Sequence, residues 1–327
     1  MNSTDQLLEK IEKAISLHQE TWGSQSPLNL YAPVSYALSA GGKRLRPLLV
    51  LLGCQLFDTR VDKAIPAALA VEVFHNFTLL HDDIMDKAEK RRGLATVHVK
   101  FSDNAAILSG DAMAFLAYRF LLESQTERIR ELSSAFTETA LEVCEGQQYD
   151  MDFESRQNVT AAEYIEMIRL KTAVLLGFAL KAGAIIGGAS ADIAAKVYQV
   201  GIGLGIAFQL QDDLLDTFGN ETDFGKNIGG DIVANKKTYL LIEALETADS
   251  HEKAELNGWL EKKDFDRREK IEAVKRIFNS LDIKSKTEKL IYSYTEEALT
   301  LLSGLPAEEN RKEYLESLCY KLMKRSH

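Results

Sequence analysis

The scarcity of proline is the feature that most restricts what this chain can fold into. Only five prolines occur in its 327 residues. Proline interrupts helices because it lacks a backbone N–H and its ring clashes with the preceding turn. The long stretches between the prolines are rich in Ala, Leu, Glu and Lys, which favour helices. We therefore expect an almost entirely α-helical (all-α) fold.

Apolar residues recur at helical spacing along most of the chain. The predicted helices cover Ser3–Gln19, Leu45–Phe57, Val61–Met85, Asn104–Glu123, Ile129–Tyr149, Ala161–Gly188 and Ala191–Phe218. Small residues between Gly183 and Gly205 should let helices approach closely or line a cavity. Because no Pro/Gly/Ser-rich linker divides the chain, we expect one domain over residues 1–327, a bundle of about a dozen helices.

Overall charge and cysteine content narrow the possible functions. Acidic residues outnumber Lys plus Arg by 49 to 39, whereas nucleic-acid-binding proteins usually have a basic surplus. The three cysteines lie far apart without metal-ligand spacing, which indicates reduced thiols. The N-terminus lacks the features of a signal peptide, and Lys181 interrupts the longest apolar run before it reaches about 18 residues. We expect a cytoplasmic protein with no nucleic-acid partner and no integral membrane segment.

Two clusters of aspartate carry the clearest chemical signal. The run DDIMD at 82–86 ends a long apolar helix, and DDLLD at 212–216 repeats the pattern. The first and last Asp of each run share one helix face, and the middle Asp points about 100° away, in support or toward solvent. Paired carboxylates at the end of an apolar helix need nearby cations. Oxygen ligands of this kind suit Mg²⁺, which completes its shell with water and phosphate oxygens.

Aspartate clusters can also be solvated loop charges. Chance alone gives about 0.07 copies of this pattern in such a chain, and two copies roughly a few times per thousand. Each copy also follows a strongly apolar segment, Phe74–Leu80 in the first case and Ile206–Leu210 in the second. The repeated pattern therefore favours metal binding.

Basic residues near these motifs could hold the phosphates. They are Lys43 and Arg46 after a Gly-Gly turn, Arg91 and Arg92 after the first aspartate run, Lys171 on a helix, and Lys226, Lys236 and Lys237 after the second run. Guanidinium groups match phosphate oxygens in pairs, while lysines act as point charges. Each residue alone would more often be a surface charge. Together, in an acidic protein, they indicate two diphosphate sites.

The order of these motifs resembles that of the polyprenyl synthetase family, the trans-isoprenyl diphosphate synthases. The matching segments are GGKRLRP, HDDIMD followed by RRG, GQQYD, KT, and FQLQDDLLDTFG followed by GK and GGD, between Gly41 and about Tyr239. The resemblance implies an all-α bundle with a deep central cavity, the isoprenoid synthase fold, and a homodimer. It also implies Mg²⁺-dependent head-to-tail condensation of isopentenyl diphosphate with dimethylallyl, geranyl or farnesyl diphosphate.

The resemblance also implies a role for each matching residue. The metal ligands would be Asp82, Asp86, Asp212 and Asp216, with Asp83 and Asp213 in support. The isopentenyl diphosphate site would be formed by Lys43, Arg46, His75 and Arg92, although a lone histidine on a buried helix is more often a core residue. The cations around the allylic diphosphate would be Arg91, Lys171, Lys226 and Lys236, with Lys237 an equal candidate for the last place. Catalytic roles would fall to Lys171, Thr172 and Gln209, the last two beside the reacting carbon, and Gln147 would line that pocket.

Product length in this family depends on bulky residues on the helix before the first aspartate run. At 1.5 Å per residue, Phe77 lies about 7.5 Å and Phe74 about 12 Å below Asp82. An aromatic at position 77 disfavours long products, and its small neighbour Thr78 resembles the geranylgeranyl-producing group. Farnesyl diphosphate is the second choice of product and a longer polyprenyl chain the third. Both phenylalanines could also be ordinary core residues.

Two other functions are compatible with a helical chain of this kind. A terpene cyclase also uses an aspartate-rich first motif, but it would replace the second run by an Asn/Ser/Glu triad and would not need Lys43 and Arg46. A non-catalytic helical partner subunit would be expected to have lost one or more charged motifs, and all are present here. Metal-dependent turnover would separate these possibilities.

Overall fold

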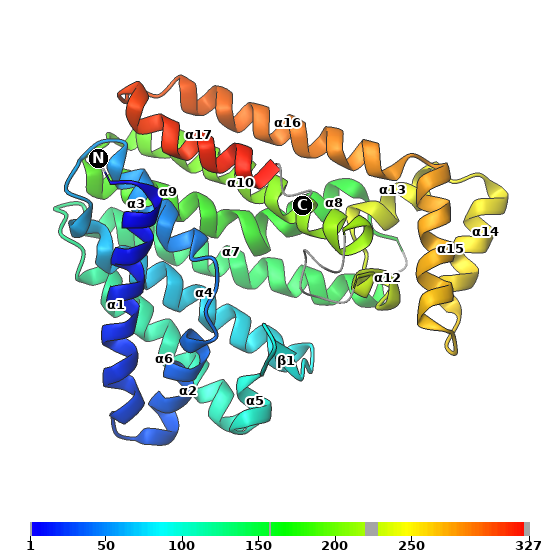
Figure 1. Ribbon diagram of the computed structural model, residues 1–327, viewed down its shortest axis with the longest axis horizontal. Helices are drawn as coiled ribbons and strands as arrows, with labels where there is room; N and C mark the ends of the chain where they lie inside the picture. Colours follow the sequence, from blue (N-terminus) through cyan, green and yellow to red (C-terminus); the bar gives the residue numbers. More distant parts are fainter. Residues whose placement is uncertain (1, 157, 220–227, 324–327) are drawn as a thin grey trace. The chain divides into compact units, whose positions relative to one another are not determined.

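The computed structural model describes residues 2–156, 158–219 and 228–323, and its regular structure is almost entirely helical (Figure 1). The chain forms two compact units. Unit 1 comprises Met1–Thr137, Phe178–Tyr198 and Leu305–Tyr314, and unit 2 comprises Glu138–Gly177, Gln199–Gly304 and Leu315–His327.

Unit 1 contains the N-terminal helices and the first aspartate run. Its elements are α1 (Thr4–Ser24), α2 (Leu28–Ser39), α3 (Leu45–Gln55), the 3₁₀ helix η1 (Val61–Ala64), α4 (Ile65–Met85), the two-stranded antiparallel ribbon β1 (Lys90–Arg91) and β2 (Leu94–Ala95), α5 (Val97–Lys100) and α6 (Asp103–Leu122). Helix α1 begins with a capping box between Ser3 and Gln6, and α4 begins with Pro66 in its first turn. Helix α4 packs on α3 and α6, which makes it the core helix of this unit.

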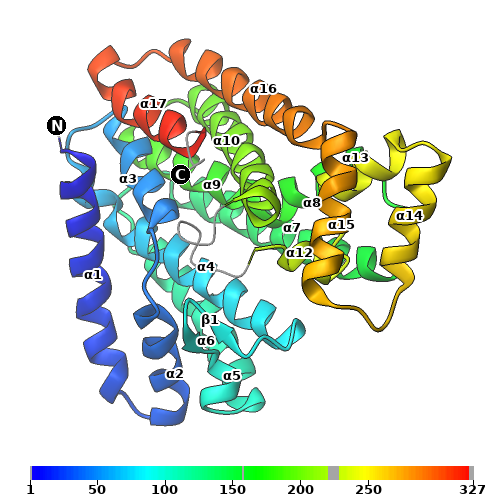
Figure 2. The same cartoon turned by 45° about the vertical axis from the view of Figure 1, so that its right-hand side comes forward.

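Unit 2 contains the second aspartate run. Its elements are α8 (Ala161–Ile168), the π-helical turn η2 (Arg169–Ala173), α12 (Gly230–Val233), α13 (Tyr239–Thr247), α14 (Ser250–Glu261), α15 (Arg267–Ser280) and α16 (Ile283–Ser303). Helices α14 and α15 pack as a pair at the end of this unit (Figure 2). Four further helices contain the boundaries between the units: α7 (Ile129–Ser155), α9 (Val174–Gly187), α10 (Ala191–Phe218) and α17 (Glu309–Met323).

The all-helical expectation is confirmed, with local differences. The segment predicted as one helix over Val61–Met85 begins as the 3₁₀ helix η1 and becomes α-helical at Ile65. The segment predicted as one helix over Ala161–Gly188 is interrupted by η2, and the segment after the first aspartate run contains the ribbon β1–β2. The apolar periodicity shows neither feature, because a five-residue π turn is too short to establish a period of its own and a two-residue strand is too short to show alternation. The single domain and its deep central cavity stay predictions.

Small residues allow close helix packing within each unit, as the sequence indicated. In unit 1, Gly183 of α9 lies against the backbone of Val50, where an added Cβ would clash. In unit 2, Gly205 of α10 lies in the same way against Ala173 of η2. These contacts bring α9 and η2 into backbone contact with their neighbours.

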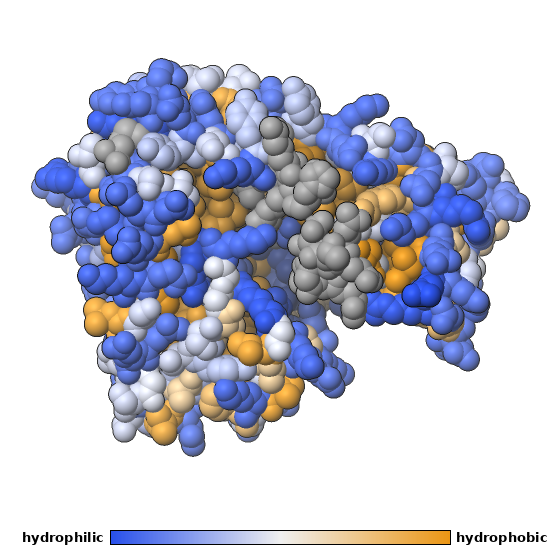
Figure 3. Space-filling view, viewed as in Figure 1, coloured by the Kyte–Doolittle hydropathy of each residue, from blue (hydrophilic) through white to orange (hydrophobic). Residues whose placement is uncertain are grey.

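Three helical segments are long and apolar enough to cross a membrane when judged by length and composition alone: Asp103–Leu122, Ala161–Gly187 and Ala191–Phe218. The expectation that no apolar run reaches this length was therefore wrong, because isolated charges such as Lys181 do not end these helices. Within Ala161–Gly187, 83% of the apolar window is buried inside the protein, so packing accounts for its composition. Hydrophilic residues cover most of the protein face seen in Figure 3.

Candidate functional site

The first aspartate run lies in the last turn of α4, and an arginine supports it. The middle carboxylate, Asp83, is buried, and Arg91 of β1 donates to its Oδ1 from Nε at 2.8 Å. The same guanidinium donates from NH2 to Asp82 Oδ2 at 3.4 Å. Burial raises the pKa of Asp83, and the charge of Arg91 opposes that rise. Asp86 caps the helix and is exposed, one turn beyond Asp82.

The second aspartate run lies in the last turns of α10, and neutral groups support it. The hydroxyl of Tyr164 donates to Oδ2 of the buried Asp213, and Gln209 Nε2 donates to Oδ1 at 3.0 Å. Thr172 Oγ1 in turn donates to Gln209 Oε1 at 3.1 Å. Burial and the charge of Asp231 raise the pKa of Asp213 to about 7, while Lys236 and the two hydrogen bonds oppose the rise.

Asp216, the last carboxylate of the second run, also contacts the start of α12. Asp216 Oδ2 accepts the backbone N–H of Asp231 at 2.9 Å, and its main-chain carbonyl accepts that of Gly229 at 2.7 Å. Gly229 has a φ of 78°, a left-handed conformation that favours glycine. Asp216 of α10 is therefore tied to the start of α12, and Asp212 lies one turn before it on the same helix.

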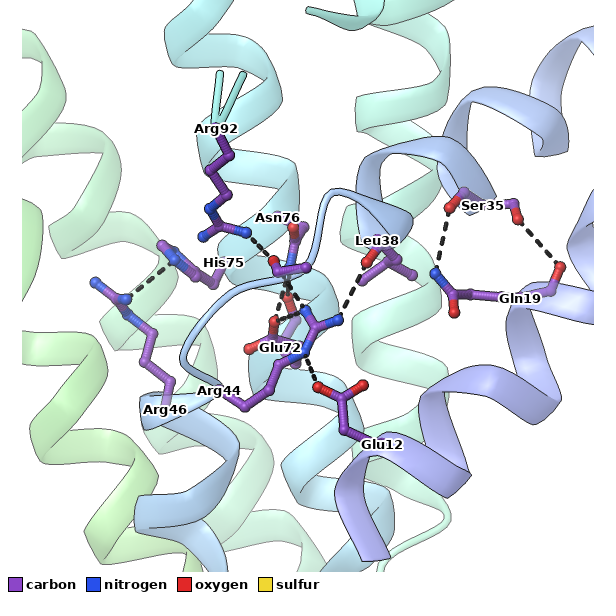
Figure 4. A network of polar contacts seen from close by, with 11 residues as sticks. Glu12, Gln19, Ser35, Leu38, Arg44, Arg46, Glu72, His75, Asn76 and Arg92 are labelled. Atoms are coloured by element: carbon purple, nitrogen blue, oxygen red, sulfur yellow. Dashed lines mark hydrogen bonds and ion pairs between the residues drawn. The ribbon is translucent and has the colours of Figure 1, made fainter. Parts of the chain in front are cut away.

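The Gly41–Arg46 loop is held by a buried arginine that we did not predict as a site residue. Arg44 is 5% exposed and adopts a left-handed φ of 47° at the start of α3. Its guanidinium donates to Glu72 of α4 at 2.6 Å, to Glu12 of α1 at 2.9 Å, and to the carbonyl of Leu38 at 3.2 Å (Figure 4). Arg44 therefore ties this loop to three helices of unit 1, while the neighbouring Lys43 is exposed.

The predicted pair Arg46 and His75 is brought together. Arg46 NH1 lies 3.0 Å from His75 Nε2 (Figure 4). Arginine can only donate, so this nitrogen accepts and the ring proton lies on Nδ1. Burial, together with Arg46, Arg92 and further arginines, lowers the pKa of His75 well below its usual value. His75 is therefore a neutral imidazole with one N–H available for donation.

Arg92 reaches the same loop from the ribbon. It has a left-handed φ of 52°, and its NH1 donates to the carbonyl of Gly41 (Figure 4). Gly42 has a φ of 142°, which favours glycine, and an added Cβ would displace the Arg92 guanidinium, 2.8 Å away. Arg46, His75 and Arg92, three of the four predicted isopentenyl diphosphate residues, therefore meet around one loop of unit 1.

Lys171 lies in the π turn η2, a type of distortion that often marks functional sites. Its Nζ lies 2.5 Å from Asp150 Oδ2 of α7. Gly146 of α7 lies directly against the backbone of Lys171, which is why this α7 position must be glycine. Burial alone would raise the pKa of Asp150, but Lys236 and Lys171 outweigh it and lower that pKa. Gln147, the predicted pocket residue, is half-buried on the same helix.

The two candidate lysines after the second aspartate run have different surroundings. Lys236 is close enough to Asp150 and Asp213 to affect both pKa values. Lys237 Nζ donates to the carbonyl of Phe153 at the end of α7, at 2.8 Å. Lys236 and Lys237 therefore both stay candidates for a phosphate contact. Lys226 lies outside the described residues.

The predicted length-determining residues lie on α4 as expected. The rings of Phe74 and Phe77 are 5.3 Å apart, and Phe74 is buried while Phe77 is half-buried. The Thr78 hydroxyl donates to the carbonyl of His75 at 2.8 Å, one turn back along the helix. The chain-length role of all three stays a prediction.

The described carboxylates alone do not form a complete metal site. Within residues 2–156, 158–219 and 228–323, no three His, Cys, Asp or Glu side chains are grouped closely enough to hold a metal ion alone. Mg²⁺ suits such a set, since it keeps several waters and takes further ligands from phosphate oxygens.

Sequence reasoning missed the residues that hold the predicted ones in place. Arg44, Glu72, Asp150 and Tyr164 are all buried or half-buried polar groups with partners far along the chain. Tyr164 and Asp213 are 49 positions apart, so no local spacing could reveal their contact. Only the glycine of GQQYD gave an indirect signal, because a glycine inside a helix often marks close backbone packing.

Known proteins share much of the sequence of this chain. The family model described as polyprenyl synthetase matches residues 27–278. A geranylgeranyl diphosphate synthase of Methanosarcina mazei is 44% identical over 222 residues, which cover 67% of this chain and 68% of that protein.

Solved structures of other proteins match the fold of this chain over 98% to 100% of its length. A crystal structure of a geranylgeranyl pyrophosphate synthase matches with a TM-score of 0.92 and 43% identity, covering 100% of both chains. A geranylgeranyl pyrophosphate synthase from Corynebacterium glutamicum, in complex with isoprenyl diphosphate and magnesium, matches with a TM-score of 0.85 and 26% identity over 98% of both chains.

Proposed function

Because the chain belongs to the polyprenyl synthetase family, we propose that it is a short-chain isoprenyl diphosphate synthase that makes geranylgeranyl diphosphate. It would add isopentenyl diphosphate head-to-tail to dimethylallyl, geranyl and farnesyl diphosphates in turn. The observation that carries the proposal is the pair of aspartate runs, each at the C-terminal end of a helix with its middle carboxylate buried.

Mg²⁺ is the metal that the donor set fits. We propose that Asp82, Asp86, Asp212 and Asp216 hold it. When bound, Mg²⁺ neutralises the charge of the leaving diphosphate. Asp83 and Asp213 act indirectly, because both are committed to protein partners, Arg91 in the first case and Tyr164 with Gln209 in the second.

Two groups of cations would hold the two diphosphates. Arg46 and Arg92, with the exposed Lys43, offer positive charge to isopentenyl diphosphate, and the Nδ1–H of neutral His75 offers a further donor. The allylic diphosphate would be held by Arg91, Lys171 and Lys236. Binding both substrates in a fixed relative position is the main requirement of a bimolecular condensation.

Charge stabilisation would complete the reaction. As the allylic C–O bond breaks, positive charge develops on the allylic carbon and negative charge on the diphosphate. The oxygens of Thr172 and Gln209 would face the positive carbon, and the cations would face the leaving group. The double bond of isopentenyl diphosphate would then form the new C–C bond, and loss of a proton to the released diphosphate would restore a double bond.

Product length would depend on Phe77. Its ring lies on α4 between the first aspartate run and the buried ring of Phe74, where it would limit the depth available to a growing chain. Farnesyl diphosphate is the alternative product.

A homodimer is part of the proposal, and α6 supports it. Only 44% of the apolar window of this helix is buried inside the protein, in contrast to 83% for Ala161–Gly187. Its exposed apolar residues include Leu108, Leu122 and Phe115, the last with 76% of its side chain exposed. An apolar face of this kind suits a second copy of the chain. The enzyme would work in the cytoplasm, without nucleic acid and without an integral membrane segment.

The test is turnover with defined substrates. Purified protein would be incubated with Mg²⁺, isopentenyl diphosphate and one of the three allylic diphosphates, and the products sized after removal of the diphosphate. We expect geranylgeranyl product from the wild type, a longer product from Phe77→Ala, and no change from the control Tyr292→Ala on the exposed face of α16.

Each other outcome has a distinct meaning. Farnesyl product alone would keep the reaction and contradict the product length. Unchanged product from Phe77→Ala would remove Phe77 from the length mechanism. No product with any allylic substrate would contradict the proposal and favour the non-catalytic partner subunit.

A further inference from the structure

The hydroxyl of Tyr164 has a partner that suggests more than a core role. Tyr164 of α8 is 1% exposed, and its hydroxyl donates to Oδ2 of Asp213, which is 3% exposed. A buried hydroxyl and a buried carboxylate both need hydrogen-bond partners, since neither reaches water. Each therefore restricts the orientation of the other.

Asp213 also contacts Gln209, which in turn contacts Thr172, and both of these are predicted catalytic residues. Asp213 Oδ1 accepts from Gln209 Nε2 at 3.0 Å, and Gln209 Oε1 accepts from Thr172 Oγ1 at 3.1 Å. In this structure both Asp213 oxygens accept, Oδ2 from Tyr164 and Oδ1 from Gln209. The Gln209 amide must therefore turn its nitrogen toward Asp213 and its oxygen toward Thr172, so Asp213 determines which way this amide points.

The direction of these hydrogen bonds determines whether oxygen atoms or N–H groups of Thr172 and Gln209 remain to face a substrate. Thr172 has one hydroxyl proton and uses it on Gln209. The remaining lone pairs on Thr172 Oγ1 and Gln209 Oε1 can only accept, so both oxygens stabilise a nearby positive charge. A reversed Gln209 amide would place an N–H there instead and would oppose such a charge.

We propose that Tyr164 is a positioning residue that fixes the Asp213 carboxylate, so that Gln209 and Thr172 present oxygen atoms to the developing allylic cation. This inference rests on the proposed function, because the cation arises only in that reaction. Tyr164 acts through Asp213 and is not placed in contact with the substrate.

The first test is Tyr164→Phe, which removes only the hydroxyl and keeps the ring in the core. We expect kcat to fall about tenfold, while KM for isopentenyl and allylic diphosphates stays within about twofold, because the interaction matters mainly in the transition state. The matched control is Tyr118→Phe, which removes a hydroxyl bonded to Thr137 at 3.0 Å in unit 1. It should leave kcat and KM unchanged.

A double-mutant cycle separates positioning from general stability. Gln209→Leu removes the amide through which Tyr164 acts. In that background Tyr164→Phe should lower kcat by less than about twofold, since coupled neighbours are not additive. A tenfold loss in both backgrounds would show that Tyr164 acts independently of Gln209 and would overturn the proposal.

Two further measurements keep the test decisive. Calorimetric binding of inorganic diphosphate with Mg²⁺ should be the same for wild type and Tyr164→Phe, and a large loss of affinity would contradict a role confined to the allylic carbon. If Tyr164→Phe does not fold, Asp213→Asn gives the same test: its amide offers one oxygen, which Tyr164 takes, so Gln209 must turn around. Wild-type kcat in Asp213→Asn would overturn the proposal.

The wild-type reaction distinguishes this inference from the proposed function. An inactive wild type contradicts the function itself. An active wild type with an equally active Tyr164→Phe contradicts only the role of Tyr164.

Discussion

The two aspartate runs have the same sequence pattern but are supported in different ways. In both runs the middle carboxylate is buried, 5% exposed for Asp83 and 3% for Asp213. Asp83 pairs with the guanidinium of Arg91, whereas Asp213 accepts hydrogen bonds from the neutral groups of Tyr164 and Gln209. Burial raises the pKa of both carboxyls, and for Asp213, which lies near Asp231, the pKa reaches about 7.

This difference shows that two aspartate runs of the same spacing can be held in place by different side chains. The arginines of unit 1 supply charge, which stabilises Asp83 and keeps His75 neutral. The supporting groups of Asp213 supply direction instead, because a tyrosine hydroxyl and an amide orient the carboxylate and contribute no net charge. The first run is thus supported by an opposite charge and the second by oriented hydrogen bonds.

The largest expected effect tests whether the two runs share one function. Asp82→Asn and Asp212→Asn should each lower kcat at least about a hundredfold, because each removes charge from the proposed metal site. Steady-state kinetics over a range of Mg²⁺ concentrations would measure this loss. Asp264→Asn, in an exposed loop of unit 2, is the control and should keep full activity. A strong loss in only one of the two variants would show that the runs are not equivalent.

An effect of intermediate size tests the contrast between charged and neutral support. Arg91→Met should lower the free energy of unfolding by roughly 2–3 kcal/mol, because it leaves the buried Asp83 carboxylate without its cation. Asp213→Asn should change it by less than about 1 kcal/mol, because Tyr164 can still donate to the new amide oxygen. Urea unfolding without Mg²⁺ or diphosphate would measure both values.

The double variant Arg91→Met with Asp83→Asn is the control for this comparison. It should recover most of the lost stability, because no unpaired carboxylate remains. If Arg91→Met is as stable as wild type, then Arg91 does not support Asp83 by charge, and the contrast between the two runs is not valid.

The smallest effect is a pH dependence that belongs to unit 1. The pKa of His75 is lowered well below 6.5, mainly by burial and by Arg46 and Arg92. Below pH 6.5 the unfolded chain binds a proton at this position that the folded protein does not bind. The free energy of unfolding should therefore fall as the pH falls, by up to about 1.4 kcal/mol per unit.

A His75→Gln variant isolates this contribution. Its stability should change less than that of the wild type between pH 7.5 and 5.5 in urea unfolding, because Gln does not titrate. Equal slopes in the two proteins would contradict the assignment of a neutral His75.

Sequence reasoning predicted the elements whose signal is local. Helix α10 has the predicted bounds, Ala191–Phe218, because its apolar residues keep one period to the end. Helix α7 continues to Ser155, beyond the predicted Tyr149, through a polar segment that lacks such a period. The spacing of the aspartate runs was likewise visible, since it depends only on the helical repeat.

The supporting residues could not be predicted in the same way. The GGKRLRP segment contains three cations, and nothing in their spacing shows that Arg44 is the buried one, held by Glu72 and Glu12. The same holds for Asp150 beside Lys171, which depends on how α7 packs on η2. These pairings depend on tertiary contacts between segments far apart in the chain.

The π turn η2 has a consequence for which changes of chain length this protein can tolerate. Tyr164 and Thr172 are eight residues apart, which in an unbroken α-helix would separate their directions by about 80°. The wider turn over Arg169–Ala173 absorbs part of that angle, and both side chains reach the groups around Asp213. Deleting one residue from this turn would rotate one of them by about 100° relative to the other. We therefore expect homologous chains to keep the number of residues in this turn.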